Sequence, residues 1–258
     1  MSDKHYAVAI ITAVPRETEG VMRLYSRWER IDGEDGAQAY YETTFRRGGE
    51  TFRLVTAQQD EMGITAAASL SHNLIARFHP QYLIMTGIAA GIGAEQLYGD
   101  VIIPNVIWNY AGGRFVRPEE ADIHLGNVGF QPRPSSLTLS PDIEALVRQV
   151  ADDPENQFHI HLGPMVCGTA VVANREVVDQ QVRSQLPTTA GLDMESYGVF
   201  YAARKAWNSQ TEPIVIKSVC DYADEEKCDL YQKFAAFTSS EFAKVFYEKY
   251  LPLQGGEA

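Results

Sequence analysis

Short apolar segments rich in β-branched residues alternate with segments of helical periodicity along almost the whole chain, and this alternation limits the fold more than any other feature. Residues 81–86 and 213–219 are almost wholly apolar, which is typical of strands covered on both faces. The helical segment 63–78 is rich in alanine and other small residues, which favours close packing on a sheet. The sequence therefore predicts a layered α/β domain with helices around a central sheet.

The remaining elements follow the same alternation. A Gly-Gly pair at positions 48 and 49 separates two alternating runs, which is typical of a β-hairpin turn. Residues 111–136 contain several glycines, three prolines and mixed charge, so we expect a long loop there. The predicted strands are residues 6–12, 39–46, 51–57, 81–86, 100–108, 158–162, 165–173, 190–194 and 213–219. The first predicted helix begins near residue 16, and the others cover 63–78, 142–150, 175–185, 196–206 and 230–250.

The chain of 258 residues shows no internal repeat, linker or low-complexity segment, so we expect one domain over residues 1–258 with its core at about 6–250. The first apolar run ends at Pro15; it is too short for a membrane span and has no cleavage site. Three cysteines without Cys-x-x-Cys spacing fit a reduced cytosolic protein. A net charge of −12 repels nucleic-acid phosphates. We therefore predict a cytoplasmic protein that binds neither membrane nor nucleic acid.

Three acidic residues follow apolar strands of the predicted sheet. Glu17 comes just after the first strand, Glu195 after the strand 190–194, and Asp221 after the strand 213–219. Polar groups at the carboxyl ends of strands meet at the ligand crevice of an open α/β sheet. A single carboxylate beside a strand end is also common as a helix cap or a surface charge. Three of them together favour one shared acidic site.

The sequence resembles a known family through four segments that occur in order. They are Ile11-Thr-Ala-Val-Pro-Arg-Glu17, Met85-Thr-Gly-Ile-Ala-Ala-Gly91 followed by Gly99-Asp-Val101, Gly191-Leu-Asp-Met-Glu195, and Lys217-Ser-Val-Cys-Asp221-Tyr-Ala-Asp224. With this spacing, residues 6–250 resemble the purine nucleoside phosphorylase and nucleosidase superfamily, especially its methylthioadenosine/S-adenosylhomocysteine nucleosidase branch. The resemblance implies a three-layer α/β/α fold around a mixed, twisted sheet. It also implies a homo-oligomer, a dimer or a hexamer, that binds a small purine nucleoside or nucleotide and needs no cofactor.

The resemblance implies a role for each of several residues. Asp221 matches the aspartate that contacts the base, where a carboxylic acid kept protonated by burial would protonate N7 of the leaving purine. Glu195 matches the glutamate that accepts hydrogen bonds from the ribose 2′- and 3′-hydroxyls and lies near the positive charge that develops on the sugar. Met194 would pack on the sugar face, although a buried methionine is more often part of a core.

Two positions favour water over phosphate as the nucleophile. In the nucleosidase branch the position of Glu17 holds the general base that activates water, and a glutamate there would repel a phosphate dianion. After Thr86 and Gly87, in the second phosphate element, the family usually has a serine, whereas this chain has Ile88, whose side chain donates no hydrogen bond. We therefore expect hydrolysis, with Gly87 and Ile88 among the substrate-binding residues.

The base-binding segment departs from the adenine-specific pattern. Val171 takes the place of an aromatic residue that stacks on the base, while Val172 would offer its backbone N–H and C=O to the purine edge. Adenine specificity is therefore plausible on the resemblance, without a stacking ring at this position. Four aromatic residues beside strands are alternatives for stacking, or are packing residues. They are Trp108, Tyr110, Tyr197 and Tyr222.

The sequence does not determine which group the substrate carries on its 5′ carbon. The methylthio branch accepts an apolar tail, whereas stretches such as Val-Val-Ala-Asn-Arg-Glu-Val-Val-Asp, residues 171–179, resemble superfamily members from bacterial defence systems that cleave adenine nucleotides. The glycine series 87–93 would bend backbone N–H groups into an anion-binding nest, although glycine-rich turns are usually only turns. Basic residues are candidates for contact with a 5′-phosphate. They are Arg46, Arg47, Arg114, Arg117, Arg175 and Lys217.

Three other signals are set aside. His159 and His161 suggest a metal pair, but no third ligand has suitable spacing, so we predict no metal. Cys220 stands where the family has serine, and a buried packing role fits it better than a nucleophile. The glycines at 87, 91 and 93 are not followed by the helix of a dinucleotide-binding motif. The sequence thus predicts a hydrolytic purine nucleosidase; the alternatives are a phosphate-dependent phosphorylase and a nucleotide-sensing domain without turnover.

Overall fold

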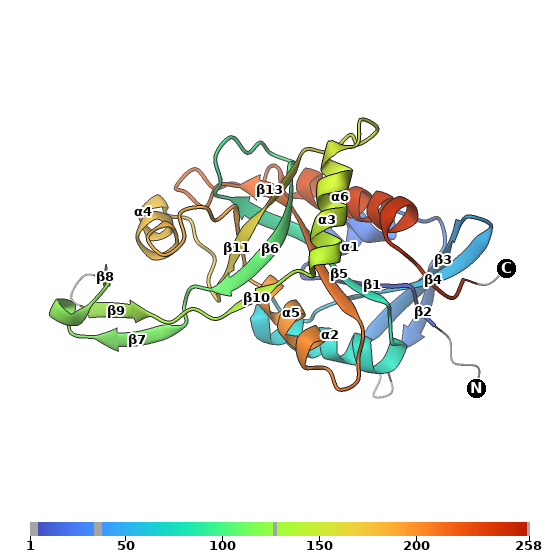
Figure 1. The fold of residues 1–258 in the computed structure, drawn as a ribbon, viewed down its shortest axis with the longest axis horizontal. Helices are drawn as coiled ribbons and strands as arrows, with labels where there is room; N and C mark the ends of the chain where they lie inside the picture. The colour runs from blue at the N-terminus through green and yellow to red at the C-terminus, as the bar shows by residue number, and fades with distance from the viewer. Residues whose placement is uncertain (1–4, 34–37, 126–127, 257–258) are drawn as a thin grey trace.

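A mixed ten-stranded sheet forms the centre of the computed structural model, which describes residues 5–33, 38–125 and 128–256 (Figure 1). Along the sheet the strands follow the order β10-β6-β11-β12-β5-β1-β4-β3-β2, and β13 pairs with both β5 and β6. The strands are β1 (Val8–Thr12), β2 (Glu29–Asp32), β3 (Ala39–Arg47), β4 (Glu50–Gln58), β5 (Tyr82–Gly91), β6 (Val101–Asn109), β10 (Ser136–Thr138), β11 (Ile160–Cys167), β12 (Gly191–Asp193) and β13 (Glu212–Asp221).

The sheet closes on itself at one end. Because β13 bridges β5 and β6 while β12 bridges β5 and β11, the strands β5, β13, β6, β11 and β12 form a closed ring of paired strands. Strand β13 runs parallel to β5, whereas β12 runs antiparallel to it. The carboxyl end of β12 therefore points back along β5 and delivers the residues that follow it to the middle of that strand.

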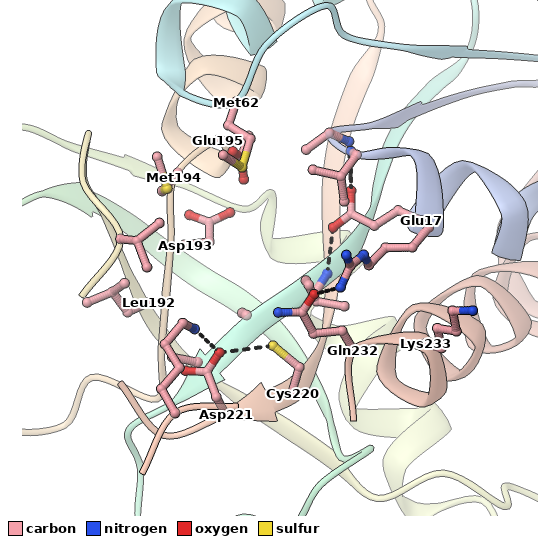
Figure 2. A pocket seen from close by; sticks show the side chains of 18 of the residues that line it. Glu17, Met62, Leu192, Asp193, Met194, Glu195, Cys220, Asp221, Gln232 and Lys233 are labelled. Atoms are coloured by element: carbon pink, nitrogen blue, oxygen red, sulfur yellow. Dashed lines mark hydrogen bonds and ion pairs between the residues drawn. The ribbon is translucent and has the colours of Figure 1, made fainter. Parts of the chain in front are cut away.

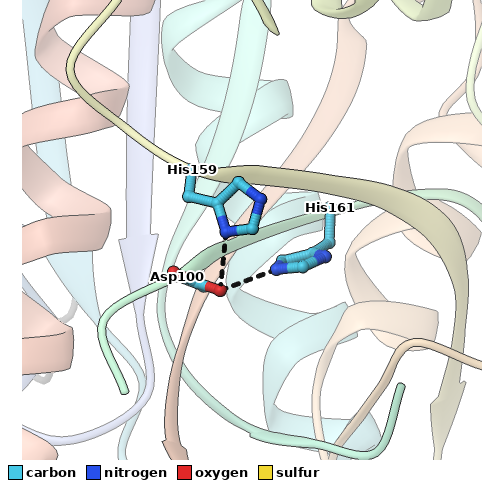
Figure 3. A group of neighbouring side chains, drawn as sticks. All are labelled: Asp100, His159 and His161. Atoms are coloured by element: carbon cyan, nitrogen blue, oxygen red, sulfur yellow. Dashed lines mark hydrogen bonds and ion pairs between the residues drawn. The ribbon is translucent and has the colours of Figure 1, made fainter. Parts of the chain in front are cut away.

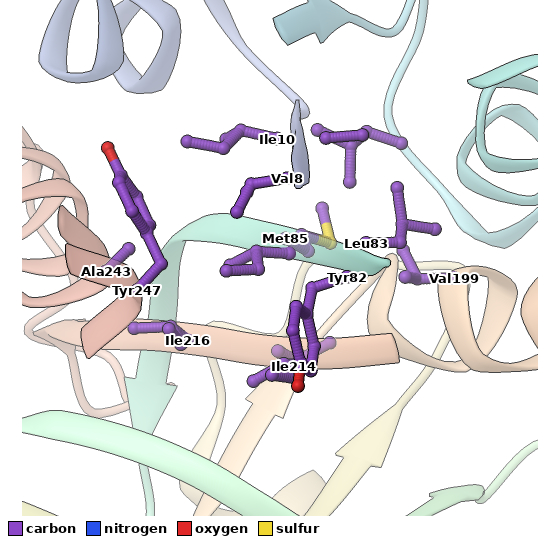
Figure 4. Close-up of a cluster of buried hydrophobic side chains, with 14 of the residues drawn as sticks. Val8, Ile10, Tyr82, Leu83, Met85, Val199, Ile214, Ile216, Ala243 and Tyr247 are labelled. Atoms are coloured by element: carbon purple, nitrogen blue, oxygen red, sulfur yellow. The ribbon is translucent and has the colours of Figure 1, made fainter. Parts of the chain in front are cut away.

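Helices cover both faces of the central parallel strands. On one face, helix α1 (Pro15–Met22) packs on α6 (Gln232–Val245), which continues into a π-helical turn at Phe246–Tyr250. On the other face, α2 (Ile64–Phe78) packs on α5 (Ser196–Lys205). Between them lie the fully buried side chains of β1, β5 and β13, among them Ile10, Leu83 and Ile214 (Figure 4). Strands buried on both faces need no polar alternation, which explains the continuous apolar runs. The three-layer α/β/α fold is confirmed.

Most predicted elements are present with shifted ends. The hairpin between β3 and β4 turns at Gly48 and Gly49, both with positive φ, as a turn of that type requires. The predicted helix 175–185 is α4 (Arg175–Val177) followed by a π-helical turn, Val178–Arg183, and the helix predicted at 142–150 is α3 (Pro141–Asp152). Two strands predicted at 158–162 and 165–173 are one strand, β11, whose pairing with β6 shifts register between Gly163 and Met165.

The predicted long loop at 111–136 is wrong. It contains a second sheet of three antiparallel strands, β7 (Gly113–Val116), β8 (Ile123–Leu125) and β9 (Val128–Pro132), with a 3-10 turn at Pro118–Glu120, and it ends in β10. This small sheet projects from the body of the molecule (Figure 1). Its strands are short and bury only Ile123, Gly129 and Phe130, so they carry no strong hydrophobic pattern. Strand β2 escaped prediction for the same reason, because none of its residues is buried.

The glycine series also behaves differently from the expectation of an anion nest. Strand β5 continues through Gly87 and ends only at Gly91, and its pairing with β13 is unbroken as far as Ala89. The backbone N–H groups there belong to the sheet rather than to a turn around an anion. Among the described helices, none combines the length and the apolar character that a bilayer crossing requires.

Candidate active site

A cavity of about 560 Å³ opens where β1, β5, β12 and β13 meet the start of α6 (Figure 2). It collects residues from six separate segments, which are the β1–α1 turn, Met62 before α2, the end of β5, residues 171–172, the β12–α5 turn and the end of β13 with the segment after it. Its lining includes Glu17, Ile88, Val171, Val172, Met194, Glu195 and Asp221. Folding thus brings the three predicted carboxyl groups to one cavity from positions far apart in the sequence.

Glu17 is held by backbone amides at the bottom of this cavity. Its Oε2 accepts hydrogen bonds from the N–H groups of Ala13 (2.7 Å) and Val14 (3.2 Å), and its Oε1 accepts one from Ile88 (2.9 Å). Glu17 is only 2% exposed. The bond to Val14 is that of a glutamate in the first turn of α1, so Glu17 also caps its own helix. A carboxylate fixed by three donors keeps one orientation.

Gly87 makes room for this carboxylate. It does not line the cavity itself, but a Cβ at this position would lie 2.2 Å from Oε1 and 2.7 Å from Cδ of Glu17. No side chain other than hydrogen fits there while Glu17 keeps its three hydrogen bonds. Ile88 contributes its backbone N–H to Glu17 and lines the cavity. These two adjacent residues of β5 therefore define where the Glu17 carboxylate lies.

Glu195 lies beside a fully buried lysine. Its Oε2 is 3.4 Å from Nζ of Lys217, and its Oε1 accepts a hydrogen bond from the N–H of Gly63 (3.1 Å). Lys217 Nζ also lies 3.5 Å from Oδ2 of Asp193, whose carboxylate accepts hydrogen bonds from the backbone N–H and the hydroxyl of Ser196 at the start of α5. One ammonium thus serves two buried carboxylates.

The electrostatics of this group follow from burial and mutual contact. Burial raises the pKa of Glu195 above its usual range, and the attraction of Lys217 opposes that effect. For Lys217, burial alone would lower the pKa, but the carboxylates of Glu195, Glu17 and Asp193 outweigh it and raise the pKa. Lys217 therefore stays protonated and is the counter-ion of the acidic site.

Asp221 ends β13 at the opposite end of the cavity from Glu17 (Figure 2). Its Oδ1 accepts a hydrogen bond from the N–H of Ala223 (2.9 Å), and its Oδ2 forms an ion pair with Lys227. The Cys220 thiol donates to the same Oδ2 at 3.2 Å. Burial, together with the adjacent Asp221, raises the pKa of Cys220, which disfavours the reactive thiolate. Cys220 is thus a partner of Asp221 and not a nucleophile.

The aromatic alternatives for base stacking lie elsewhere. None of Trp108, Tyr110, Tyr197 and Tyr222 lines the cavity within the described part of the chain, and its lining there contains no aromatic ring. Trp108 and Tyr110 pack in a second apolar cluster, and Tyr222 donates its hydroxyl proton to the carbonyl of Gln96. Val171, 58% exposed, lies at the rim and Val172 is buried, so apolar side chains take the place of a stacking ring.

The predicted phosphate contacts are mostly wrong, because those arginines are occupied or distant. The Arg47 guanidinium donates to backbone carbonyls near the C-terminus, Arg114 donates to Gln131 in the projecting sheet, and Arg117 pairs with nearby glutamates. Neither they nor Arg46 and Arg175 line the cavity.

Three other cations do line the cavity: Arg16, Lys227 and Lys233. Arg16 hydrogen-bonds Gln232 of α6, and Lys227 pairs with Asp221. Lys227, Gln232 and Lys233 come from the segment after β13 and the first turn of α6, which carry no motif, so sequence reasoning had no signal for them. The position of Arg16, next to Glu17, was the one available signal. The cavity lining therefore combines five carboxyl groups, those of Glu17, Glu19, Asp193, Glu195 and Asp221, with these three cations.

Comparisons with known proteins concern the family and the fold of the chain. The sequence model of the phosphorylase superfamily matches residues 7–248. An uncharacterized protein of Sinorhizobium fredii is 26% identical over 231 residues, which cover 84% of this chain and 54% of that protein. The ATP nucleosidase Cap17 of Escherichia coli is 22% identical over 257 residues, 91% of this chain and 49% of the nucleosidase. The chain thus spans about half the length of these two relatives.

Solved structures share the fold over nearly their whole length. The crystal structure of S-adenosylhomocysteine nucleosidase from Streptococcus pyogenes in complex with 5-methylthiotubericidin superimposes with a TM-score of 0.76. The sequences are 20% identical, and the match covers 98% of this chain and 99% of that one. At this identity the likeness concerns the fold.

Proposed function

This chain belongs to the phosphorylase superfamily, and on that premise we propose that it hydrolyses the N-glycosidic bond of a purine nucleoside or nucleotide and releases the free base. One observation carries the proposal: Glu17, Glu195 and Asp221, from three separate segments, face a single cavity large enough for a small ligand. A binding site without turnover has no need of both a base and an acid. The similarity to an ATP nucleosidase supports the same reaction class.

In this proposal Glu17 is the general base that activates water. Its Oε2 accepts two backbone hydrogen bonds and its Oε1 accepts one. Since each carboxylate oxygen has two acceptor positions, Oε1 keeps one position without a partner among the described residues. A water molecule that donates to this position would be oriented and deprotonated as it attacks the sugar carbon, and such general-base catalysis contributes about 10²–10⁴ in rate.

Glu195 and Asp221 serve the sugar and the leaving group. Glu195 accepts hydrogen bonds from the ribose hydroxyls and stabilises the positive charge that develops on the ring as the glycosidic bond breaks. Asp221 delivers a proton to N7 of the purine, which turns a poor leaving group into a neutral base. The carboxylate must first take up that proton from solvent, because in the free protein it is the ion-pair partner of Lys227. Lys227, as the ion-pair partner of Asp221, would have to yield its contact to the base as the substrate enters. Met194, Val171 and Val172 supply the apolar contacts.

Water, not phosphate, is the proposed nucleophile. The Glu17 carboxylate would repel a phosphate dianion from the position where it must attack, and the Ile88 side chain offers no hydrogen bond to it. Chromatography of the products formed with and without inorganic phosphate tests this directly. We expect equal rates of base release and free ribose or ribose phosphate in both samples; strict dependence on phosphate, with ribose 1-phosphate as product, would establish a phosphorylase instead.

We extend the proposal to adenine nucleotides as substrates. The cations Arg16 and Lys233 at the cavity support a negatively charged 5′ group, since an apolar methylthio tail forms no ion pair with them, whereas Lys227 is already paired with Asp221. ATP, AMP, adenosine and methylthioadenosine should be compared in parallel under the same conditions. Preferential release of adenine from the nucleotides is expected, and a clear preference for methylthioadenosine would contradict this extension. If one of these compounds binds but no free base appears over hours of incubation, the result would favour a sensing domain without turnover.

The setting of the reaction completes the proposal. Cleavage of adenine nucleotides fits a bacterial antiviral defence role, as the resemblance of residues 171–179 implies. We also propose a homo-oligomer, a dimer or a hexamer, in line with the superfamily resemblance, and a cytoplasmic location, in line with the cysteine pattern. Analytical ultracentrifugation of the purified protein measures the oligomeric state, and a monomer at micromolar concentration would contradict it.

A further inference from the structure

Three side chains with metal-binding atoms converge outside the nucleoside cavity (Figure 3). Oδ2 of Asp100 lies 2.9 Å from Nδ1 of His159 and 2.7 Å from Nε2 of His161. One ligand atom from each residue lies within 4.8 Å of the others. None of the three residues lines the cavity that holds Glu17, Glu195 and Asp221.

Strand pairing produces this cluster. The parallel strands β6 and β11 pair with Ile160 opposite Val101, so Asp100 just before β6 lies beside the residues that flank Ile160. His159 and His161 are two residues apart, and side chains at that spacing in extended chain point to the same face. The third ligand is not apparent from the sequence, because Asp100 is about sixty residues away in the chain and only strand pairing brings it beside the histidines.

The donor set suits a divalent transition metal. Two imidazole nitrogens and one carboxylate oxygen are the ligands of many zinc sites that keep an open position for water, and imidazole is a good ligand for Zn²⁺, Ni²⁺ and Cu²⁺. His159 is 65% exposed and His161 19%, so solvent and a metal ion reach the cluster from outside.

The distances also agree with a site that opens slightly around an ion. With metal–ligand bonds of about 2.0–2.2 Å, neighbouring ligand atoms of a tetrahedral zinc site lie about 3.3–3.5 Å apart. The two histidine–aspartate distances, 2.9 and 2.7 Å, are about 0.4–0.8 Å shorter than that, so the ligands must move apart to admit the ion. Binding requires only that each neutral imidazole carry its proton on the ring nitrogen that faces away from Asp100. The hydrogen bond from Leu97 (2.9 Å) meanwhile holds the carboxylate in place.

We propose that Asp100, His159 and His161 form a surface site for one divalent transition-metal ion, with Zn²⁺ as the preferred ion. The ion would tie the connection between β5 and β6 to the start of β11. This inference does not depend on the proposed reaction, because the three residues lie apart from the acidic cavity. The rival explanation is that the two histidines are simply hydrogen-bond donors to Asp100, in which case the cluster has no measurable affinity for a metal.

The test uses the full chain, stripped with a chelator, dialysed and titrated with Zn²⁺ alone by calorimetry. We expect one equivalent to bind and the melting temperature to rise. The double variant His159→Gln/His161→Gln should lose this equivalent, and His161→Gln alone should weaken binding by more than about tenfold. His124→Gln, which changes an exposed histidine of the projecting sheet, is the matched control and should bind as the native chain does.

Two results would overturn the proposal. One is a native chain that takes up no Zn²⁺ at micromolar concentrations. The other is equal uptake by the native chain and the double variant, which would assign the ion to other residues. Asp100 is left unchanged in the test because it also accepts the hydrogen bond from Leu97, so its substitution would disturb the fold. Thermal unfolding of each metal-free variant verifies that the glutamine substitutions leave the fold intact.

Discussion

Replacing Lys217 by methionine should destabilise the protein more than any other substitution at the site. The ammonium lies 3.4 Å from Oε2 of Glu195 and 3.5 Å from Oδ2 of Asp193, with no exposed surface. At an effective dielectric constant of about 20, each contact supplies about 5 kcal/mol of attraction, part of which the cost of burying the charges offsets. Removing the cation leaves two buried carboxylates without their counter-ion. We expect the free energy of unfolding to fall by about 3–5 kcal/mol.

The pH dependence of this loss identifies its cause. Burial raises the pKa of Glu195, and without Lys217 that pKa rises further. An acid whose pKa is higher in the folded than in the unfolded state destabilises the fold as the pH rises above the pKa of the unfolded state. At a pH where the acid is protonated in both states, it does not change the free energy of unfolding. The deficit of Lys217→Met should therefore be largest near neutral pH and shrink as the pH falls towards about 4, the ordinary range of glutamate.

Urea unfolding of the native chain and of Lys217→Met at several pH values measures both quantities. Lys217→Arg keeps the charge and should lose much less stability. The double variant Lys217→Met/Glu195→Gln removes the charges of one ion pair and should recover part of the loss, which gives the coupling between the two residues. A deficit below about 1 kcal/mol, or one that does not change with pH, would refute the assignment of Lys217 as the counter-ion of the buried carboxylates.

Three further substitutions test the proposed reaction. Asp221→Asn should lower the turnover number by about 10²–10⁴ while substrate binding, measured by calorimetry, stays nearly intact; near-normal turnover would mean that another group protonates the base. Gly87→Ala places a methyl group on the Glu17 carboxylate, so turnover should fall by about 10²-fold in a protein of native circular dichroism, and an active variant would contradict the role of Glu17. Lys233→Gln should raise KM for AMP by about tenfold and leave KM for adenosine unchanged, as steady-state kinetics with both substrates will tell.

The sequence predicted those parts of the fold that depend on local pattern. The strands around Ile10, Leu83 and Ile214 were visible because both of their faces are buried, which leaves an uninterrupted apolar run. The small sheet at 113–132 was missed because its strands bury few residues, and only side chains such as Phe130 pack inward. The ring that β13 closes between β5 and β6 depends on pairing between distant segments, which no local pattern encodes.

The same division holds for the site. Glu17, Glu195 and Asp221 could be found because each follows an apolar strand within a motif. Lys227 and Lys233 could not, since they come from a connecting segment and the first turn of a helix, where a lysine is ordinarily a solvated charge. The prediction that certain arginines contact the phosphate was wrong for the opposite reason. Basic residues are frequent on any surface, and only the fold shows that Arg47 serves backbone carbonyls and that Arg114 lies in the projecting sheet.

The placement of charge links the fold to the proposed chemistry. A ribosyl cation needs negative charge near it, yet buried carboxylates repel one another and would otherwise take up protons. Two lysines compensate these carboxylates. Lys217 in the interior of β13 pairs with Glu195 and Asp193, and Lys227 pairs with Asp221 at the end of β13. Glu17 is held differently, by three backbone amides that carry no net charge. Unlike Glu195 and Asp221, Glu17 therefore has no ion-pair partner among the described residues, which is the condition that a base acting on water requires.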